Sequence, residues 1–527
     1  MKLKGLDHLG EWNPQLFREL KGLFKPRNLF LTVASSLIVQ FLVLMVFSQQ
    51  HCLKYQVGGV CAQLDWNILW QFVYRTLNWI VPFLMLVCGF YLIVSDLGKE
   101  GRRGTLNFIR LSPQSSQSIL MGKILGVPAL VYLWVALAIP LHLGSALAAG
   151  VPLLWLLGIY TLWGVGCCLF YSTACLYSLL WSSPQCEPKS LAGAGSLLAC
   201  ILAVPYISAI NFSIEVYLSG SGLGHWKWFL LPLGDQPALV FAWMLITLSV
   251  GTYWIWQAGN RTFRNPSSTL LSKGQSYWLV GSFQVWLLGF VLPELSTASS
   301  NTQFGIGCFF LFGLNPTCFL ILNGALSPQR QAIQDWARYR RDSGSTRKGF
   351  WNHSLVKDLV WGEKSPALVA IAINILITVA IWVPWMLLWS LKSGYQDDLK
   401  IPLALIGLLF TINSTLLYAA LAGLMVFMKK SKQRLGAAGI VGAVVILASL
   451  LGTHGLKMPF LWVLSPWPVI AFIGQMEPVT FFLGLLAQVA ILGLLTLQLT
   501  RQLKKAGEST SKMLFAESPS LPIRGVR

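Results

Sequence analysis

Residues 124–186 read ILGVPALVYLWVALAIPLHLGSALAAGVPLLWLLGIYTLWGVGCCLFYSTACLYSLLWSSPQC and contain no Asp, Glu, Lys or Arg. An α-helix crosses the hydrocarbon core of a bilayer with about 20 mostly apolar residues, so this stretch is long enough for two crossings. Gly150 and Pro152 are typical turn residues and place the break between the crossings. The stretch therefore predicts a pair of transmembrane helices.

The composition of the whole chain indicates the same class. Hydrophobic residues make up 55% of the 527 residues, charged residues 11%, and the mean hydropathy is +0.62. An ordinary soluble domain has roughly 25% charged residues. The first apolar run begins at Leu29 and is too long for the core of a signal peptide, so we expect residues 1–28 to be retained. We expect an all-α, polytopic bundle of transmembrane helices.

Charge-free stretches recur along the chain and predict about 12 crossings. Short cytoplasmic loops carry the excess of Lys and Arg in membrane proteins. With both termini cytoplasmic, the 39 Lys and Arg fall inside except Lys54, Arg75, Lys227, Lys392, Lys400 and Lys457. We therefore expect a multi-pass protein of the cell membrane, whose net charge of +20 reflects topology and anionic lipid rather than a nucleic-acid partner. The crossings centre near residues 38, 84, 135, 167, 200, 247, 285, 313, 378, 414, 444 and 489.

Two amphipathic helices are expected, each directly before a crossing. In residues 13–30, Asn13 can cap a helix that has Pro14 at its first position. Residues 352–369 align with this segment without gaps. Basic amphipathic helices of this kind lie in the membrane interface. Their expected membrane-facing residues are Leu16, Leu20, Leu23, Leu355 and Leu359.

The repeated segment suggests a division of the chain into three parts. We expect residues 1–276 to form a unit with six crossings. Residues 277–351 would add two crossings and a basic cytoplasmic loop. Residues 352–527 would be a degenerate second repeat with four crossings and a cytoplasmic tail.

The cysteines and histidines indicate no metal site and no cofactor. Of the ten cysteines, only Cys52 and Cys61 share an outer loop, where Gly58 and Gly59 would let the chain turn back. They form either a disulfide, in an oxidising compartment, or two free thiols. None of the six His lies at ligand spacing from a Cys pair or a carboxylate.

Residues 100–123, EGRRGTLNFIRLSPQSSQSILMGK, interrupt the apolar sequence on the expected cytoplasmic side. Gly104 can end the preceding helix, and Thr105 can cap a short helix, TLNFIRL. Ser112 can cap a second helix that has Pro113 at its first position and runs into the third crossing. Exposed apolar residues at such a tip usually mark contact with a partner. The expected apolar surface consists of Leu106, Phe108 and Ile109.

This segment resembles the cytoplasmic loop of ABC-2 type transporter permeases. In that family a Glu, a Gly-Thr pair, a short helix, a Ser-Pro or Thr-Pro pair and a Gly-Lys that opens the third crossing form the contact with the ATPase subunit. The amphipathic helix before the first crossing and a broken outer segment at 225–237 are similar too. The matching positions are Glu100, Gly104, Thr105, Leu106, Ser112, Pro113, Gly122 and Lys123.

The resemblance implies the membrane permease subunit of an ATP-driven exporter, in which one chain or two form the translocation unit. Its expected partners are an ABC ATPase, membrane lipid and, in the two-chain case, a second permease copy. The sequence departs from the family at Asn107, where an acid is common, and in its length, since a typical member has six crossings. In the second half of the chain, the large inner loop 324–365 shares with residues 100–123 only the tetrapeptide LSPQ, at 326–329 and 111–114.

The chain lacks the phosphate-binding loop that hydrolysis of ATP would need. That loop requires G-x-x-x-x-G-K-[ST], and Gly122-Lys123 is followed by Ile124. We therefore expect no enzyme activity.

An ion-coupled transporter usually keeps an ionisable group at membrane depth, and only His142 lies deep. Two other classes stay open, a membrane-embedded transferase acting at the outer face and a non-transporting assembly factor. The apolar crossings favour a lipid-like or hydrophobic substrate.

Overall fold

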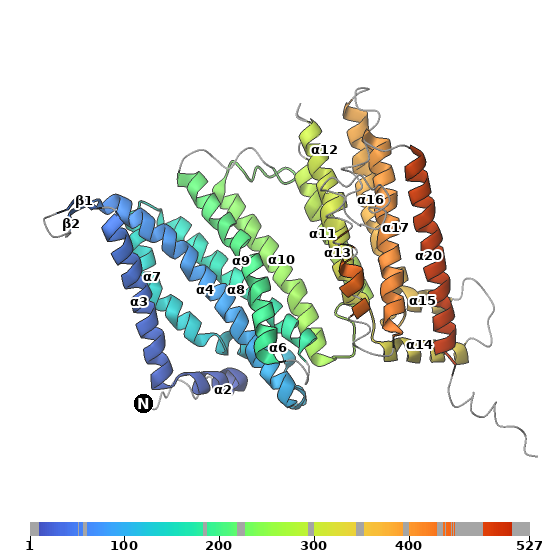
Figure 1. Cartoon of the computed structure of the whole chain (residues 1–527), viewed down its shortest axis with the longest axis horizontal. Coiled ribbons are helices and arrows are strands. Elements are labelled where there is room, and N and C mark those ends of the chain that lie inside the picture. Colours follow the sequence, from blue (N-terminus) through green and yellow to red (C-terminus); the bar gives the residue numbers. More distant parts are fainter. Residues whose placement is uncertain are drawn as a thin grey trace, which may run out of the picture. The chain divides into compact units, whose positions relative to one another are not determined.

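The structure, a computed structural model, consists of two compact helical units (Figure 1). The first unit comprises residues 1–226 and 232–266, and the second comprises residues 227–231 and 267–527. Each unit packs its own buried hydrophobic cluster. The structure describes residues 10–50, 52–55, 61–182, 187–218, 227–292, 300–343, 353–393, 400–428 and 478–508, with short pieces between 436 and 447.

Six helices of the first unit are long and apolar enough to cross a membrane. They lie at the first six predicted positions. Pro205 lies inside the fifth of these helices, which continues through it to residue 218. The six are α3 (Pro26–Gln50), α4 (Trp66–Arg103), α7 (Ala129–Ala148), α8 (Leu153–Trp181), α9 (Pro188–Leu218) and α10 (Pro237–Arg264).

Short elements flank these helices. Strands β1 (Cys52–Tyr55) and β2 (Cys61–Leu64) pair antiparallel, with Cys52 opposite Leu64 and Cys61 opposite Tyr55. The cysteine side chains lie outside the described residues, so the choice between disulfide and free thiols stays a prediction. The other short elements are α2 (Pro14–Leu23), α5 (Thr105–Arg110) and α6 (Ser116–Gly126).

The second unit combines long apolar helices with two short polar ones. Asn315-Pro316 does not break the crossing near residue 313, because a π-helical turn, η2 (Phe310–Leu314), joins the helices on either side. The helices are α11 (Lys273–Val291), α12 (Ser300–Phe309), α13 (Asn315–Leu326), α14 (Arg330–Ser343), α15 (His353–Trp361), α16 (Leu368–Ser393), α17 (Lys400–Val426) and α20 (Pro478–Ala506).

The all-α, polytopic class is confirmed, whereas the number of crossings stays a prediction. In the described part of the chain, ten helical spans are long and apolar enough to cross a membrane. All ten coincide with expected crossings. The crossing expected near residue 285 corresponds to α11, a helix of 19 residues outside that set. The crossing expected near residue 444 falls where only scattered residues are described.

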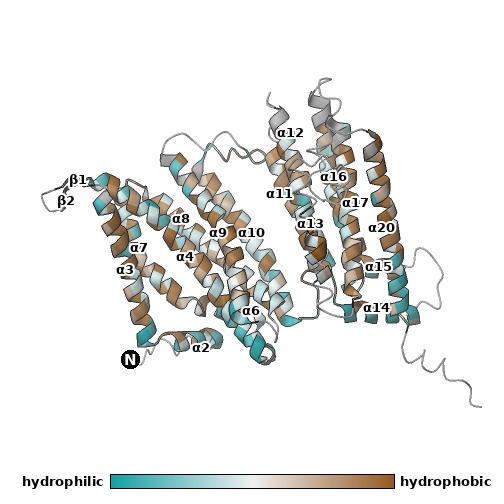
Figure 2. Cartoon of the chain, in the orientation of Figure 1, coloured by the Kyte–Doolittle hydropathy of each residue, from teal (hydrophilic) through white to brown (hydrophobic). Residues whose placement is uncertain are grey.

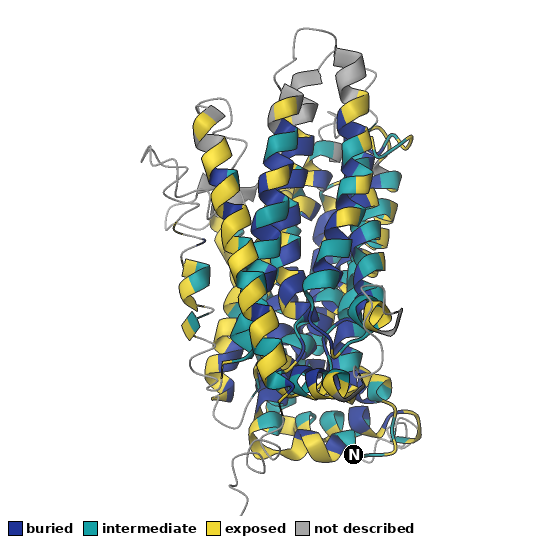
Figure 3. Cartoon of the chain, turned by 90° about the vertical axis from the view of Figure 1, so that its right-hand side faces the viewer, coloured by how far each residue is buried: buried dark blue, intermediate teal, exposed yellow. Residues whose placement is uncertain are grey.

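The helix surfaces fit a lipid environment. Figure 2 shows apolar residues along the bodies of the long helices and polar residues at α2, α14 and the lower end of α4. Exposed positions form continuous stripes on outward helix faces (Figure 3). On α3 this stripe is made of large apolar side chains, which lipid tails would cover in a membrane. They include Phe30, Leu31, Leu37, Ile38 and Phe41.

Close packing of α4 on α8 depends on Gly89. A Cβ at this position would lie 2.1 Å from Oη of Tyr171, and this hydroxyl donates a hydrogen bond to the Met85 carbonyl at 2.6 Å. Small residues let transmembrane helices approach each other closely. Gly164 on α8, by contrast, has no atom within 4 Å of its Cβ position.

We expect Gly89→Ala to lower the free energy of unfolding by about 1–3 kcal/mol, because the methyl group overpacks the α4–α8 contact. Gly164→Ala is the matched control. It meets open space and should be neutral or slightly stabilising, since Ala favours the helix. Thermal unfolding of both variants in nanodiscs measures the difference, and equal melting temperatures would contradict this account of the packing.

Candidate functional site

The loop between α4 and α6 departs in part from its predicted structure. α4 ends at Gly104, whose φ of 74° lies in the left-handed region that glycine favours. α5 follows directly, as predicted. Thr105 is not its cap, because Gly104 holds the cap position. The Thr105 hydroxyl instead donates to the carbonyl of Glu100 at 3.2 Å.

The expected exposure of Leu106 and Ile109 is wrong. These side chains are 6% and 9% exposed and belong to the buried cluster of the first unit, because α5 packs back against the end of α4. Phe108, 79% exposed, and Leu111, 85% exposed, form the apolar surface instead. We call Phe108 and Leu111 the α5 tip.

The start of α6 also differs from the prediction. Ser112 and Pro113 lie in the turn after α5, and the helix begins at Ser116. Its cap is Ser115, whose hydroxyl accepts the N–H of Ser118 at 3.2 Å. α6 does not run on into the third crossing, since it ends at Gly126 and α7 begins after Pro128.

Lys123 on α6 is the buried centre of a charge cluster. Its side chain is 1% exposed, and a lysine ammonium has three hydrogen-bond donors. Nζ lies 2.8 Å from Glu19, 2.5 Å from Asp96 and 2.7 Å from Glu100. Each donor thus has a carboxylate. The ammonium ties α2, which carries Glu19, to α4, which carries the other two acids.

Arg18 on α2 is a second cation of the cluster. Its guanidinium lies 3.1 Å from Glu19 and 2.8 Å from Glu100, and its side chain is about half exposed. Three carboxylates therefore face two cations. We refer to Arg18, Glu19, Asp96, Glu100 and Lys123 as the charge cluster.

The attraction between opposite charges in the cluster outweighs the cost of burying Lys123 and Glu19. Burial alone would lower the pKa of Lys123, but Asp96, Glu100 and Glu19 raise this pKa above its ordinary value. Burial would likewise raise the pKa of Glu19, but Lys123 and Arg18 lower it. Lys123 is therefore protonated and Glu19 ionised at neutral pH.

Two glycines bring α2 close enough to α6 for this contact. A Cβ at Gly122 would lie 2.8 Å from Oδ1 of Asn13, and a Cβ at Gly126 would lie 2.7 Å from Cβ of Glu19. The predicted cap of α2 is confirmed, because Asn13 accepts the N–H of Leu16 at 3.0 Å. The Asn13 amide also donates to the Ser118 carbonyl of α6 at 2.8 Å.

A cleft of about 370 Å³ opens beside the cluster. Oxygens of Glu19, Asp96 and Glu100 lie within 4.8 Å of one another, as in many cation sites. In this structure the ammonium of Lys123 takes the position between these oxygens. The cleft is lined by Arg18, Glu19, Asp96, Lys99, Glu100, Arg103, Thr105, Phe108 and Ile109.

The second unit also holds its amphipathic helix with a buried lysine. Lys273, 2% exposed, donates to the carbonyls of Leu359 and Pro366 and to the hydroxyl of Ser365, at 2.7, 3.2 and 2.7 Å. These contacts fix the end of α15 to the start of α11. Of the predicted interfacial leucines, Leu16 is buried, Leu355 is 37% exposed, and Leu20, Leu23 and Leu359 are half-buried.

We expect Lys123→Met to lower the free energy of unfolding by about 2–4 kcal/mol, because three partly buried carboxylates lose their common partner. Arg102→Met is the control, since it removes one positive charge from an exposed position near the end of α4, the helix that carries Asp96 and Glu100. It should change the stability by less than about 0.5 kcal/mol. Denaturation of both variants in the same detergent tests this, and a Lys123→Met protein as stable as the control would contradict it.

The dependence of folding stability on pH should be reversed in Lys123→Met. In the wild type, Glu19 has a lowered pKa, so its contribution to stability is present above its ordinary pKa range and is lost as the pH falls. In Lys123→Met the neighbouring carboxylates repel one another, so proton uptake stabilises the folded state. The difference in melting temperature between the two proteins should narrow from about pH 7 to about pH 5. A constant difference would mean that the acids are not coupled.

No protein-family profile, no curated protein and no solved structure matches the chain. The observations that bear on function are thus the α5 tip, the charge cluster beneath it and the long α4 that joins them to the bilayer.

Proposed function

We propose that the chain is the membrane permease subunit of an ATP-driven ABC transporter, and that a separate ATPase subunit binds the α5 tip. The observation that carries the proposal is the exposure of Phe108 and Leu111 next to the charge cluster. Exposed large apolar side chains on a polar end of a membrane protein favour a protein partner. The resemblance of residues 100–123 to the ATPase-binding loop of ABC-2 permeases supports the same partner.

The length of α4 supports a mechanical role for this end. A helix of 38 residues is about 57 Å long, whereas a bilayer with its headgroups is about 40–45 Å thick. The last turns of α4, which carry Asp96 and Glu100, would therefore project beyond the hydrocarbon. A force applied there acts on the same helix that crosses the membrane.

The charge cluster would carry that force to neighbouring elements. Lys123 binds acids on α2 and α4, so α2, α4 and α6 are joined at one point. The buried Leu106 and Ile109 fix α5 to this assembly. A partner that closes on Phe108 and Leu111 would displace the three helices together, and with them the crossings that follow α2 and α6.

The proposed substrate is a lipid-like or hydrophobic compound moved outward. This part of the proposal rests on the apolar crossings and on the family resemblance. Basic residues concentrate on the side of residues 100–123 in the predicted topology, which would place the ATPase in the cytoplasm of the cell.

We expect Phe108→Asp with Leu111→Asp to abolish binding of an ATPase subunit while the permease stays folded. Each large apolar side chain that loses its burial at an interface costs about 1.5–3 kcal/mol, which weakens binding more than about tenfold per residue. The measurement is recovery of nucleotide-binding protein and ATPase activity with the tagged permease from solubilised native membranes, with the melting temperature recorded alongside.

The matched control is Leu106→Asp with Ile109→Asp, which should lower the melting temperature because both side chains are buried. The two double variants thus separate loss of a partner from loss of the fold. If the wild-type permease recovers no nucleotide-binding subunit, or if the Phe108 and Leu111 variant recovers it unchanged, the α5 tip does not bind an ATPase.

A further inference from the structure

His142 is an ionisable side chain in the interior of the first unit. It lies in the second half of α7 and is 0% exposed. Its Nδ1 is 2.9 Å from Oη of Tyr160 on α8. Three aromatic rings surround the imidazole, with centroid distances of 5.3 Å to Tyr74, 5.6 Å to Tyr160 and 5.1 Å to Trp163.

Two polar atoms of this cluster are buried without a partner among the described residues. They are Nε2 of His142 and Oη of Tyr74, a residue that is 4% exposed. An unsatisfied polar group costs several kcal/mol in a lipid-surrounded bundle, where no bulk water can compensate. Both open atoms belong to rings that pack against each other, with their centroids 5.3 Å apart.

Other tyrosines of the first unit show that Tyr74 is a special case. Tyr132, Tyr171 and Tyr206 each donate their hydroxyl to a main-chain carbonyl, at 3.0, 2.6 and 2.6 Å. These contacts satisfy the hydroxyl within the protein, as buried tyrosines usually require. The hydroxyl of Tyr74, by contrast, has no partner among the described residues, although its ring packs against His142.

We propose that Tyr74 and His142 bind a hydroxyl group inside the first unit. A hydroxyl both donates and accepts, as does Tyr74, and Nε2 can do either according to the tautomer that Tyr160 selects. The ligand is uncharged, because α7 and α8 contain no Asp, Glu, Lys or Arg, and the exposed Arg75 lies 3.9 Å from Glu215. The inference is independent of the proposed ATPase.

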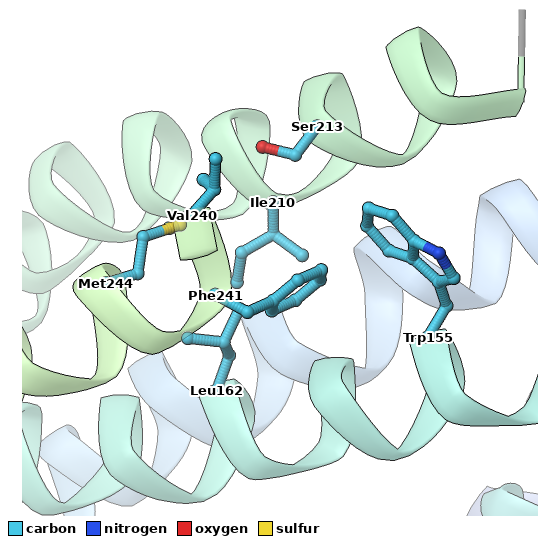
Figure 4. A pocket seen from close by; sticks show the side chains of 7 residues that line it. All are labelled: Trp155, Leu162, Ile210, Ser213, Val240, Phe241 and Met244. Atoms are coloured by element: carbon cyan, nitrogen blue, oxygen red, sulfur yellow. The ribbon is translucent and has the colours of Figure 1, made fainter. Parts of the chain in front are cut away.

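The hydroxyl can come from water or from a lipid. Tyr160 is only half-buried, so the cluster reaches the edge of the unit. The apolar pocket between α8, α9 and α10 offers no such chemistry (Figure 4). Its polar residue Ser213 already donates to the Ala209 carbonyl at 2.8 Å, and rings of Trp155 and Phe241 pack at 4.7 Å.

The first test is Tyr74→Phe in the full chain, reconstituted in nanodiscs. A bound hydroxyl would lose a hydrogen bond, so the melting temperature should fall. Tyr171→Phe is the matched control, since it removes a hydroxyl with a known partner and should also lower the melting temperature. If Tyr74→Phe melts at or above the wild-type temperature, the hydroxyl had no partner and the proposal is wrong.

The second test, on the wild-type protein, identifies whether the bound hydroxyl belongs to water or to a lipid. Radiolysis in ¹⁸O water labels side chains beside bound water, so label at Tyr74 above that at Tyr171 would identify water. A rise in melting temperature with dioleoylglycerol, absent with its methyl ether and absent in Tyr74→Phe, would identify a lipid hydroxyl. If neither the label nor the shift is seen, the proposal is overturned.

Discussion

The buried ammonium of Lys123 is the constraint on which the α2–α4–α6 end of the first unit depends. Removing a charge from water is costly unless it is paired and fully hydrogen-bonded. Lys123 meets this condition only when Glu19, Asp96 and Glu100 all lie within 2.8 Å of Nζ. The position of α2 is therefore set by electrostatics, and the small residues of α6 are what allow α2 to come so close.

The features that could be predicted from the sequence are local ones. Long stretches without charged residues identify the crossings, because the hydrocarbon core of a bilayer disfavours charged side chains in any crossing. The Asn13-Pro14 pair predicts the start of α2, since the cap bonds to a residue three positions on. The crossing near residue 313 shows the limit of such rules, because a proline usually ends a helix, whereas here a π-helical turn directly precedes Asn315-Pro316 and the helix continues.

The candidate site could be predicted only in part. Residues 100–123 are distinguished by their charge in an otherwise apolar part of the chain, and the short helix predicted there is confirmed as α5. The spacing of Leu106 and Ile109 fits an exposed tip as well as a buried face, and only the return of α5 onto α4 decides between them. Lys123 and Glu19 are 104 positions apart, so their contact depends on how α2 packs on α6. The acids of α4, four residues apart on one helix face, were the available signal.

Charged side chains lie at the ends of the units, whereas the polar side chains of the interior are neutral. The charge cluster holds the end of the first unit, whereas its interior uses neutral pairs such as Asn78 with Asn211. In the second unit, Gln284 is bonded to Asn315 and Trp382 at 2.6 and 2.8 Å. A neutral amide fixes the register of helices at a far lower cost than an ion at membrane depth. Motion driven from the charged end would therefore reach crossings that neutral hydrogen bonds keep in register, and His142 is one place in the described part of the first unit where such a bond is still open.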